Sequence, residues 1–261
     1  MSGLLAGRVA VVSGIGPGMG RDVSLALARE GADLVLAART AARLGEVAAE
    51  VRAAGRRALE VPTDVADAGA CARLAERARA ELGRIDVLVN NAFDMGPMKP
   101  LADASAEDLL QPIRVNLIGS LQLTRAVLPA MRAQGRGSIV MINSMVIRDV
   151  LPNMGPYAAS KAALLAATQG LARELGPEGI RVNSVMPGYI WGPNLQAYFA
   201  HQAKQRGVDP QAIYEETAAH TALRHLPTPE EIADAVVFFA SDLSRVITGQ
   251  SLDVNGGHVF H

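Results

Sequence analysis

The stretch Arg8-Val-Ala-Val-Val-Ser13-Gly14-Ile-Gly-Pro-Gly18-Met-Gly20 decides the expected fold. Its first six residues form a short apolar run, which predicts a buried strand. A helix-like segment, Arg21–Glu30, follows the glycines and ends at Gly31, a residue suited to helix termination. Strand, glycine turn and helix in this order make a corner where backbone N–H groups and a helix N-terminus can hold a phosphate. The alternative interpretation is a purely structural tight turn.

Apolar runs and amphipathic segments alternate in the same way through the rest of the chain. Further strands are expected at Leu34–Ala38, Ala58–Val61, Ile85–Val89, Ser138–Asn143, Ile180–Met186 and Gln250–Val254. Helices are expected at Ala41–Ala54, Ala68–Leu82, a long segment capped by Ser105 and kinked or reset near its start by Pro112, Ala158–Leu175 and Thr228–Ser241. This alternation predicts one Rossmann-type, doubly wound α/β domain over residues 1–261, with a seven-stranded parallel sheet and helices on both faces.

Candidate site residues follow six of the expected strands directly. They are Gly14, Ala38, Asp64, Asn90, Ser144 and Pro187. Because ligands of doubly wound sheets bind outside the carboxyl ends of the strands, these residues are expected to meet in one crevice.

A serine, a tyrosine and a lysine near the middle of the chain predict a proton-transfer site. Tyr157 and Lys161 are four residues apart in a helix-like segment, so they share one helix face, and Ser144 ends a strand. A free tyrosine has a pKa of about 10, and a neighbouring ammonium lowers it by favouring the phenolate. With a serine hydroxyl to hold a substrate oxygen, this set can interconvert C=O and CH–OH. The alternative is a solvated pair on an exposed helix face.

Composition bounds the class of protein. Hydrophobic residues make up 49% of the 261 residues, which is ample for a core, and the formal net charge of −1 indicates neither a nucleic-acid nor a membrane partner. The single cysteine, Cys71, excludes an intramolecular disulfide and fits a reducing compartment. No signal peptide or membrane span is recognisable, so a cytoplasmic location is expected. No metal-ligand constellation is present, and no metal is expected.

Together these motifs resemble the short-chain dehydrogenase/reductase family over essentially the whole chain. The residues that carry the resemblance are Gly14, Gly18, Gly20, Asp64, Asn90-Asn91-Ala92, Asn116, Ser144, Tyr157, Lys161, Pro187-Gly188 and Asn255-Gly256-Gly257. It implies that Tyr157 is the general acid/base, that Ser144 orients the substrate oxygen, and that Lys161 lowers the tyrosine pKa and binds the nicotinamide ribose. It also implies that Asn116 helps a proton relay through water, the alternative being an asparagine that satisfies a local helix kink.

The resemblance further implies a set of cofactor-binding residues. They are Ser13, Gly14, Gly18, Met19, Gly20, Arg39, Thr40, Asp64, Val65, Asn91, Ala92, Tyr157, Lys161, Pro187, Gly188 and Ile190. The alternative for Asp64 is an N-cap of the next helix. Two departures stand out: Phe93 replaces the glycine usual after Asn-Asn-Ala, and the threonine usual after Pro187-Gly188 is absent.

The end of the second strand predicts which nicotinamide cofactor is used. Family members that use NAD usually carry an aspartate there, where this chain has Ala38. Arg39 can meet a 2′-phosphate with a bidentate guanidinium, and Thr40 and Arg43 lie close by. NADP(H) is therefore favoured. NAD(H) remains the alternative if both arginines are ordinary surface residues.

A long insertion at residues 190–226 is expected to form a small helical lid over the substrate. Its aromatic residues, together with methionines elsewhere, predict a mostly apolar substrate, the alternative being ordinary packing. The expected substrate residues are Ser144, Met145, Met154, Tyr157 and Trp191, with Met95 and Met98 as further candidates.

Two classes of function fit these features. The first is a nicotinamide-dependent oxidoreductase that interconverts a ketone and a secondary alcohol. The second is a non-catalytic dinucleotide-binding redox sensor or scaffold, which would not need Asn116, Ser144, Tyr157 and Lys161 together. The resemblance also implies a homotetramer, for which Leu121, Val127, Ala163 and Ala167 offer apolar or small surfaces.

Overall fold

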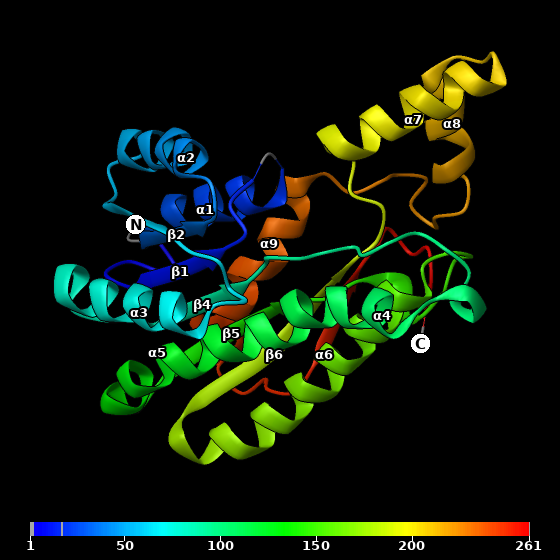
Figure 1. Cartoon of the computed structure of the whole chain (residues 1–261). Helices are drawn as coiled ribbons and strands as arrows, with labels where there is room; N and C mark the ends of the chain where they lie inside the picture. The colour runs from blue at the N-terminus through cyan, green and yellow to red at the C-terminus, as the bar shows by residue number, and fades with distance from the viewer. Residues whose placement is uncertain (1–2, 17, 261) are drawn as a thin grey trace.

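Seven parallel strands form one sheet in the computed structural model, which describes residues 3–16 and 18–260 (Figure 1). The strands are β1 (Val9–Ser13), β2 (Asp33–Ala38), β3 (Ala58–Pro62), β4 (Val87–Asn90), β5 (Gly137–Ile142), β6 (Ile180–Pro187) and β7 (Ser251–Val254). Their order is β3-β2-β1-β4-β5-β6-β7, and every neighbouring pair is parallel. The order reverses between β1 and β4, which places a ligand-binding switch point at their carboxyl ends.

Helices cover both faces of this sheet, as the alternating pattern predicts. One face packs against α1 (Met19–Arg29), α2 (Ala41–Ala53) and α9 (Pro229–Ala240). The other packs against α3 (Ala68–Leu82), α5 (Ser120–Gln134) and α6 (Gly155–Leu175). The predicted doubly wound α/β fold is therefore confirmed.

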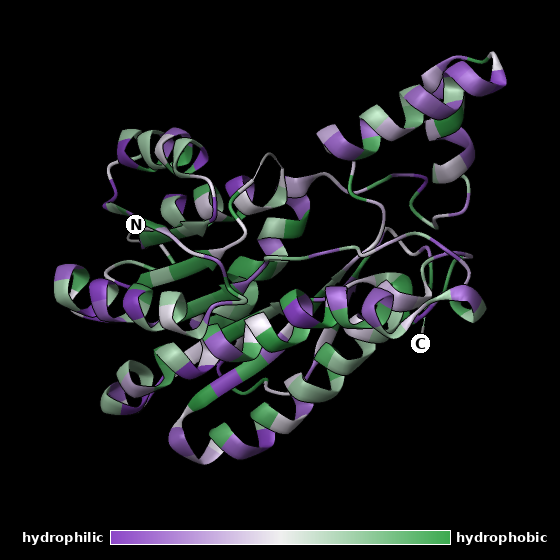
Figure 2. Cartoon of the chain, in the orientation of Figure 1, coloured by the Kyte–Doolittle hydropathy of each residue, from purple (hydrophilic) through white to green (hydrophobic). Residues whose placement is uncertain are grey.

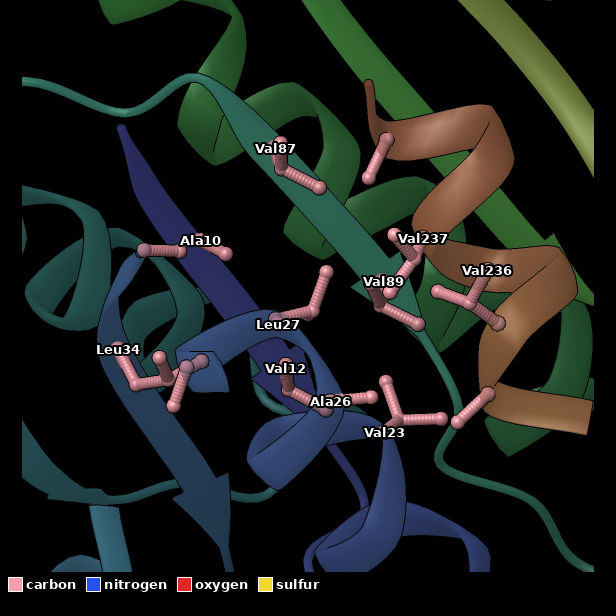
Figure 3. Close-up of a cluster of buried hydrophobic side chains, with 14 of the residues drawn as sticks. Ala10, Val12, Val23, Ala26, Leu27, Leu34, Val87, Val89, Val236 and Val237 are labelled. Carbon is pink, nitrogen blue, oxygen red and sulfur yellow. The ribbon is translucent and has the colours of Figure 1, made fainter. Parts of the chain in front are cut away.

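The core under α1 and α9 explains why the strand sequences are apolar throughout. Val12 of β1 and Val89 of β4 meet Leu27 of α1 and Val237 of α9 in a fully apolar cluster (Figure 3). Burying each such side chain contributes about 1.5–3 kcal/mol. Figure 2 shows the strands hydrophobic along most of their length, whereas the helices carry both kinds of residue. A sheet that is buried on both faces requires this distribution.

The segment before α5 is helical, and its hydrogen-bond pattern changes just after Pro112, where the sequence predicted a kink or a reset. Helix α4 (Ala106–Ile113) starts with the expected capping box between Ser105 and Asp108, and Pro112 lies inside it. The chain then continues through a π-helical turn, Arg114–Gly119, into α5. Such turns are frequent at functional sites, and this one contains Asn116.

The insertion forms a helical hairpin of α7 (Pro193–Arg206) and α8 (Pro210–Ala218) that projects from the body of the molecule (Figure 1). Gly207 ends α7 in the left-handed conformation, with φ 66°, and so reverses the chain. The hairpin has its own small core around Phe199 and Ile213. Within the described part of the chain, no helix is long and apolar enough to cross a membrane.

Candidate active site

Tyr157 and Lys161 lie in the first two turns of α6, on the face turned toward the sheet. Helix α6 opens with Gly155-Pro156, and proline suits a first helical turn because no N–H is needed there. Tyr157 is 8% exposed and Lys161 is 2% exposed. The Lys161 ammonium donates to the carbonyl of Ile142, the last residue of β5, at 2.8 Å, and lies 5.7 Å from the centre of the Tyr157 ring.

Ser144 reaches the same place from the end of β5. Its hydroxyl accepts from the Val146 N–H at 3.2 Å, which caps the short 3₁₀ turn Met145–Ile147. The same hydroxyl forms a hydrogen bond with Tyr157 that favours the phenolate. The strand end and the helix start therefore bring Ser144, Tyr157 and Lys161 together, as the spacing predicted.

Burial, rather than the neighbouring lysine, controls the protonation of this pair. Desolvation raises the pKa of Tyr157 to about 12, and the hydrogen bond with Ser144 opposes this shift only in part. Desolvation also lowers the pKa of Lys161 to about 7. Burial and the Ser144 hydroxyl account for the pKa of Tyr157 in this structure, and the lowering expected from Lys161 stays a prediction. Tyr157 is a neutral phenol in this state and can donate a proton.

Asn116 is buried between the loop after β4 and α6. Its amide donates to the Asp94 carbonyl and to the Ser160 hydroxyl, both at 2.8 Å, and its side-chain oxygen accepts from the Asp94 N–H at 2.7 Å. Ser160 in turn donates to the Tyr157 carbonyl at 2.7 Å. The carboxamide is therefore engaged in holding α6 against the loop after β4. A proton relay at this residue would have to use its main-chain carbonyl.

Ser144, Tyr157 and Lys161 line one cavity of about 260 Å³ at the carboxyl ends of the strands. Met145 and Met154, expected at the substrate, line it too, as do Met95 and the half-exposed Phe93. Met98 does not. The carboxyl edge thus holds a largely apolar chamber around the three polar groups.

Trp191 lies elsewhere than expected. Its ring packs 4.7 Å from that of Tyr214 and 5.7 Å from that of Phe199, between centroids, inside the core of the hairpin. The aromatic residues of α7 and α8 pack on one another instead of lining the cavity, because the hairpin needs a core of its own.

The glycine corner fits an anion. A Cβ on Gly20 would lie 2.3 Å from the Gly14 carbonyl oxygen, and one on Gly14 would lie 2.6 Å from Ala92, so both positions require glycine. Gly18 has φ 97° and precedes α1. Among described atoms, nothing lies within 4 Å of the Cβ position at Gly16 or Gly18, which leaves room for a phosphate before the helix N-terminus.

Hydrogen bonds connect the loop after β4 to the glycine corner. The Ser13 hydroxyl accepts from the N–H groups of Asn91 and Ala92 at 3.1 and 3.3 Å, and the Asn91 amide donates to the Gly14 carbonyl at 2.9 Å. Asn91 also lines the cavity. Asn90, by contrast, points away and donates to Thr124 of α5 at 3.2 Å.

The remaining expected cofactor residues follow the ends of their strands. Met19, Pro187, Gly188 and Ile190 line the cavity, and Arg39 and Thr40 are exposed after β2. After β3, Val65 is buried and Asp64 is exposed, with its carboxylate accepting from the Ala66 N–H at 2.9 Å. The N-cap of α3 is Asp67, not Asp64, so the alternative role for Asp64 is wrong.

Ser160 and Asp149 are among the residues near the site that were missed from the sequence. Ser160 bridges Asn116 and Tyr157, and only its position three residues after the tyrosine hinted at this. Asp149 lines the cavity from the loop before α6, and nothing in its local sequence pointed to that.

A second cavity, of about 350 Å³, lies at the opposite, amino-terminal edge of the strands. Its half-buried Arg181 donates to the carbonyls of Phe239 and Ser241 at the C-terminus of α9, at 3.0 and 3.1 Å, and so stabilises the fold. In residues 3–16 and 18–260, no group of three or more His, Cys, Asp or Glu side chains could hold a metal ion.

Comparison with known proteins adds relatives that share this architecture. The family model described as enoyl-(acyl carrier protein) reductase matches residues 14–259. A (3R)-3-hydroxyacyl-CoA dehydrogenase of Canis lupus familiaris is 38% identical, over 97% of this chain and 96% of the relative.

Two solved structures extend the comparison. L-sorbose reductase of Gluconobacter frateurii, complexed with NADPH and L-sorbose, has a TM-score of 0.94 at 32% identity and covers 100% of both chains. Carveol dehydrogenase of Mycobacterium avium, in complex with NAD, has a TM-score of 0.92 at 30% identity and covers 98% of this chain and 99% of its own.

Proposed function

The chain belongs to the short-chain dehydrogenase/reductase family, and from this premise we propose that it is a nicotinamide-dependent oxidoreductase that interconverts a ketone and a secondary alcohol. One observation carries the proposal: a protonated phenol, a serine hydroxyl and a buried amine line one apolar cavity beside a glycine corner that fits a phosphate. The relatives named above are dehydrogenases or reductases, which supports this class of reaction.

The three polar groups have distinct roles in this proposal. When a ketone is reduced, Tyr157 gives its phenolic proton to the oxygen as a hydride reaches the carbon, and in the reverse direction it takes the proton back. Ser144 donates a hydrogen bond to the same oxygen. Lys161, held by the Ile142 carbonyl, supplies a positive charge that offsets phenolate formation. Bound nicotinamide supplies or accepts the hydride.

The cofactor is proposed to lie along the carboxyl edge of the sheet. Gly14, Gly18 and Gly20 would hold its pyrophosphate, and Asp64 with the backbone of Val65 would contact the adenine. Asn91 and Ala92 would line the adenosine side. The nicotinamide end would meet six residues that all line the cavity: Met19, Tyr157, Lys161, Pro187, Gly188 and Ile190.

The alternative, a non-catalytic redox sensor, has no observation in its favour. A sensor does not need a serine hydroxyl hydrogen-bonded to a buried tyrosine, and this chain keeps both in a cavity. A panel of hydrophobic ketones and secondary alcohols, followed at the nicotinamide absorbance, tests the proposal. Turnover of any member supports the enzyme, whereas cofactor binding without turnover of any member would favour the sensor.

NADP(H) is the expected cofactor, and Arg39 is the expected cause. Arg39 follows β2, is exposed, and has no hydrogen bond or ion pair among the described residues. Replacing it should remove a charge-assisted contact with the 2′-phosphate. Arg39→Ala should therefore lower the ratio of kcat/KM for NADPH over NADH by about tenfold, the value of one such contact.

Arg245→Ala is the matched control, because Arg245 is also exposed and lies at the opposite edge of the sheet. It should leave the ratio unchanged. A wild-type preference for NADH, or equal effects of the two variants, would overturn the assignment to NADP(H).

The protein is also expected to form a homotetramer. Exposed apolar side chains gather along the edge strand β7 and the turn before it, at Leu243, Val246 and Leu252. On the long helices, Leu121, Ala163 and Ala167 are half-buried, but Val127 faces the sheet and offers no surface, which corrects that expectation. Sedimentation equilibrium at micromolar concentration should give four copies. A stable monomer would contradict this prediction.

A cytoplasmic location is part of the same proposal. The single cysteine, Cys71, is buried, and burial raises the pKa of its thiol to about 11, so it is an unreactive thiol suited to a reducing compartment.

A further inference from the structure

Among the described residues that line the cavity, one other than Lys161 has a charged side chain. The walls of the cavity are mostly apolar and include Met19, Met95, Met145, Met154 and the Phe93 ring. Asp149 adds a carboxylate from the loop before α6, and its N–H donates to the Met145 carbonyl at 3.1 Å, which fixes the loop. Asp149 is exposed, whereas Lys161 is buried. The Asp149 carboxylate is therefore exposed to solvent, whereas the Lys161 amine lies inside the protein.

The Asp149 carboxylate has no hydrogen-bond or ion-pair partner among the described residues. The adjacent arginine, Arg148, lies instead 3.7 Å from the Asp253 carboxylate. A negative charge that lines an apolar cavity without a partner is favourable for a ligand that brings a positive charge.

Tyr189 lines the cavity as well and lies within electrostatic reach of Asp149. Burial raises the pKa of Tyr189, and the phenol of Tyr198 and the carboxylate of Asp149 raise it further. A tyrosine ring and a carboxylate that line one cavity can bind an ammonium group together, through charge attraction and contact with the face of the ring. Thioether sulfurs are polarisable and tolerate such a group.

We propose that the preferred substrate is an apolar ketone or secondary alcohol that carries a positively charged amine remote from the reacting carbon, with Asp149 as the specificity-determining residue. This inference rests on the proposed oxidoreductase function. Tyr189 would contact the same amine. Substrates with a carboxylate or phosphate in that place are disfavoured by the charge of Asp149.

Three ketones of one skeleton test the inference: para-trimethylammonioacetophenone, the isosteric para-tert-butylacetophenone and para-acetylbenzoate. The measurement is kcat/KM for each, with saturating cofactor, in the wild type and in Asp149→Asn. The substituents differ in their effect on carbonyl reactivity, but this effect cancels when the ratio between ketones is compared between the two proteins. Asp149→Asn should lower the preference for the cationic over the neutral ketone about fivefold, because the carboxylate is exposed. It should raise relative turnover of the carboxylate ketone by a similar factor.

Asp234→Asn is the control, since Asp234 is an exposed aspartate on α9 that does not line the cavity. It should leave all ratios unchanged. Ratios that do not move in Asp149→Asn, or move equally in both variants, overturn the inference while turnover of the neutral ketone still supports the oxidoreductase. If no ketone reacts, the oxidoreductase proposal fails for this skeleton. Calorimetric binding of the cationic and neutral compounds to the two proteins with cofactor then decides the charge preference by itself.

Discussion

Tyr157→Phe is expected to lower kcat about a thousandfold, within the range that a positioned general acid contributes. The variant loses one hydroxyl and keeps the ring that packs against Val146 and Ala158. Because this hydroxyl carries the transferred proton, the loss should appear in kcat and kcat/KM together, while the dissociation constant of the cofactor changes little. Single-turnover kinetics and fluorescence titration measure the two quantities separately.

Tyr189→Phe is the matched control, because Tyr189 also lines the cavity and also loses only a hydroxyl. It should keep kcat within about threefold, since its hydroxyl has no part in the proposed proton transfer. Tyr157→Phe with a near-normal rate would remove Tyr157 from the chemistry. Equal losses in the two variants would indicate general damage to the cavity.

The fold could be predicted because its strands are buried on both faces. A short continuous apolar run such as Leu34–Ala38 fits a strand that is buried on both faces, and the glycine corner indicates the first crossover. The sequence predicted a kink or a reset at Pro112, and the helix changes to a π turn two residues later. The side chain of Asn116, inside this turn, is held by Asp94 and Ser160, and such long-range contacts cannot be read from a local sequence pattern.

The sequence located Ser144, Tyr157 and Lys161 correctly, because the spacing of residues along one helix and the end of one strand are local properties. The pKa shifts of Tyr157 and Lys161 could not be predicted from the sequence, because desolvation depends on everything that packs around these two side chains. The place of Trp191 was missed for a similar reason: an aromatic residue in an insertion can face a ligand or a neighbouring helix, and only the packing of α7 on α8 decides. Asp149 escaped notice since a loop aspartate has no periodic signature.

Lys161→Met is expected to weaken activity and at the same time to stabilise the protein. The proposed charge beside Tyr157 and a contact to the cofactor are lost, so kcat should fall about a hundredfold. Cofactor affinity should fall about tenfold. Methionine keeps most of the side-chain volume and removes the need to bury an amine. Lys161 has no carboxylate partner among the described residues, and its ammonium donates only to the Ile142 carbonyl.

The gain in stability has a definite pH dependence. Burial holds the pKa of Lys161 at about 7 in the folded protein, below the value of 10.5 for a free lysine. Between these two values the unfolded chain binds the proton and the folded chain does not, so stability rises with pH in that window. The cost of the lysine is therefore largest below pH 7 and is mostly relieved by about pH 10. Lys161→Met should raise the melting temperature at pH 6 by about 5 °C or more, and by much less at pH 10.

Lys204→Met is the control that separates the effect of relieving a buried lysine from the effect of losing any lysine. Lys204 lies exposed near the end of α7 and has no ion pair among the described residues. This control should show no comparable pH-dependent gain, because an exposed ammonium is solvated in both the folded and the unfolded state. Thermal scans of the three proteins at pH 6, 8 and 10, at one protein concentration, make the comparison. The melting temperature of Lys161→Met could instead exceed that of the wild type by an amount that grows with pH. This trend would have the opposite sign to that expected for a buried cation. It would mean that Lys161 is stabilised in its charged form by groups that the fold brings close in solution.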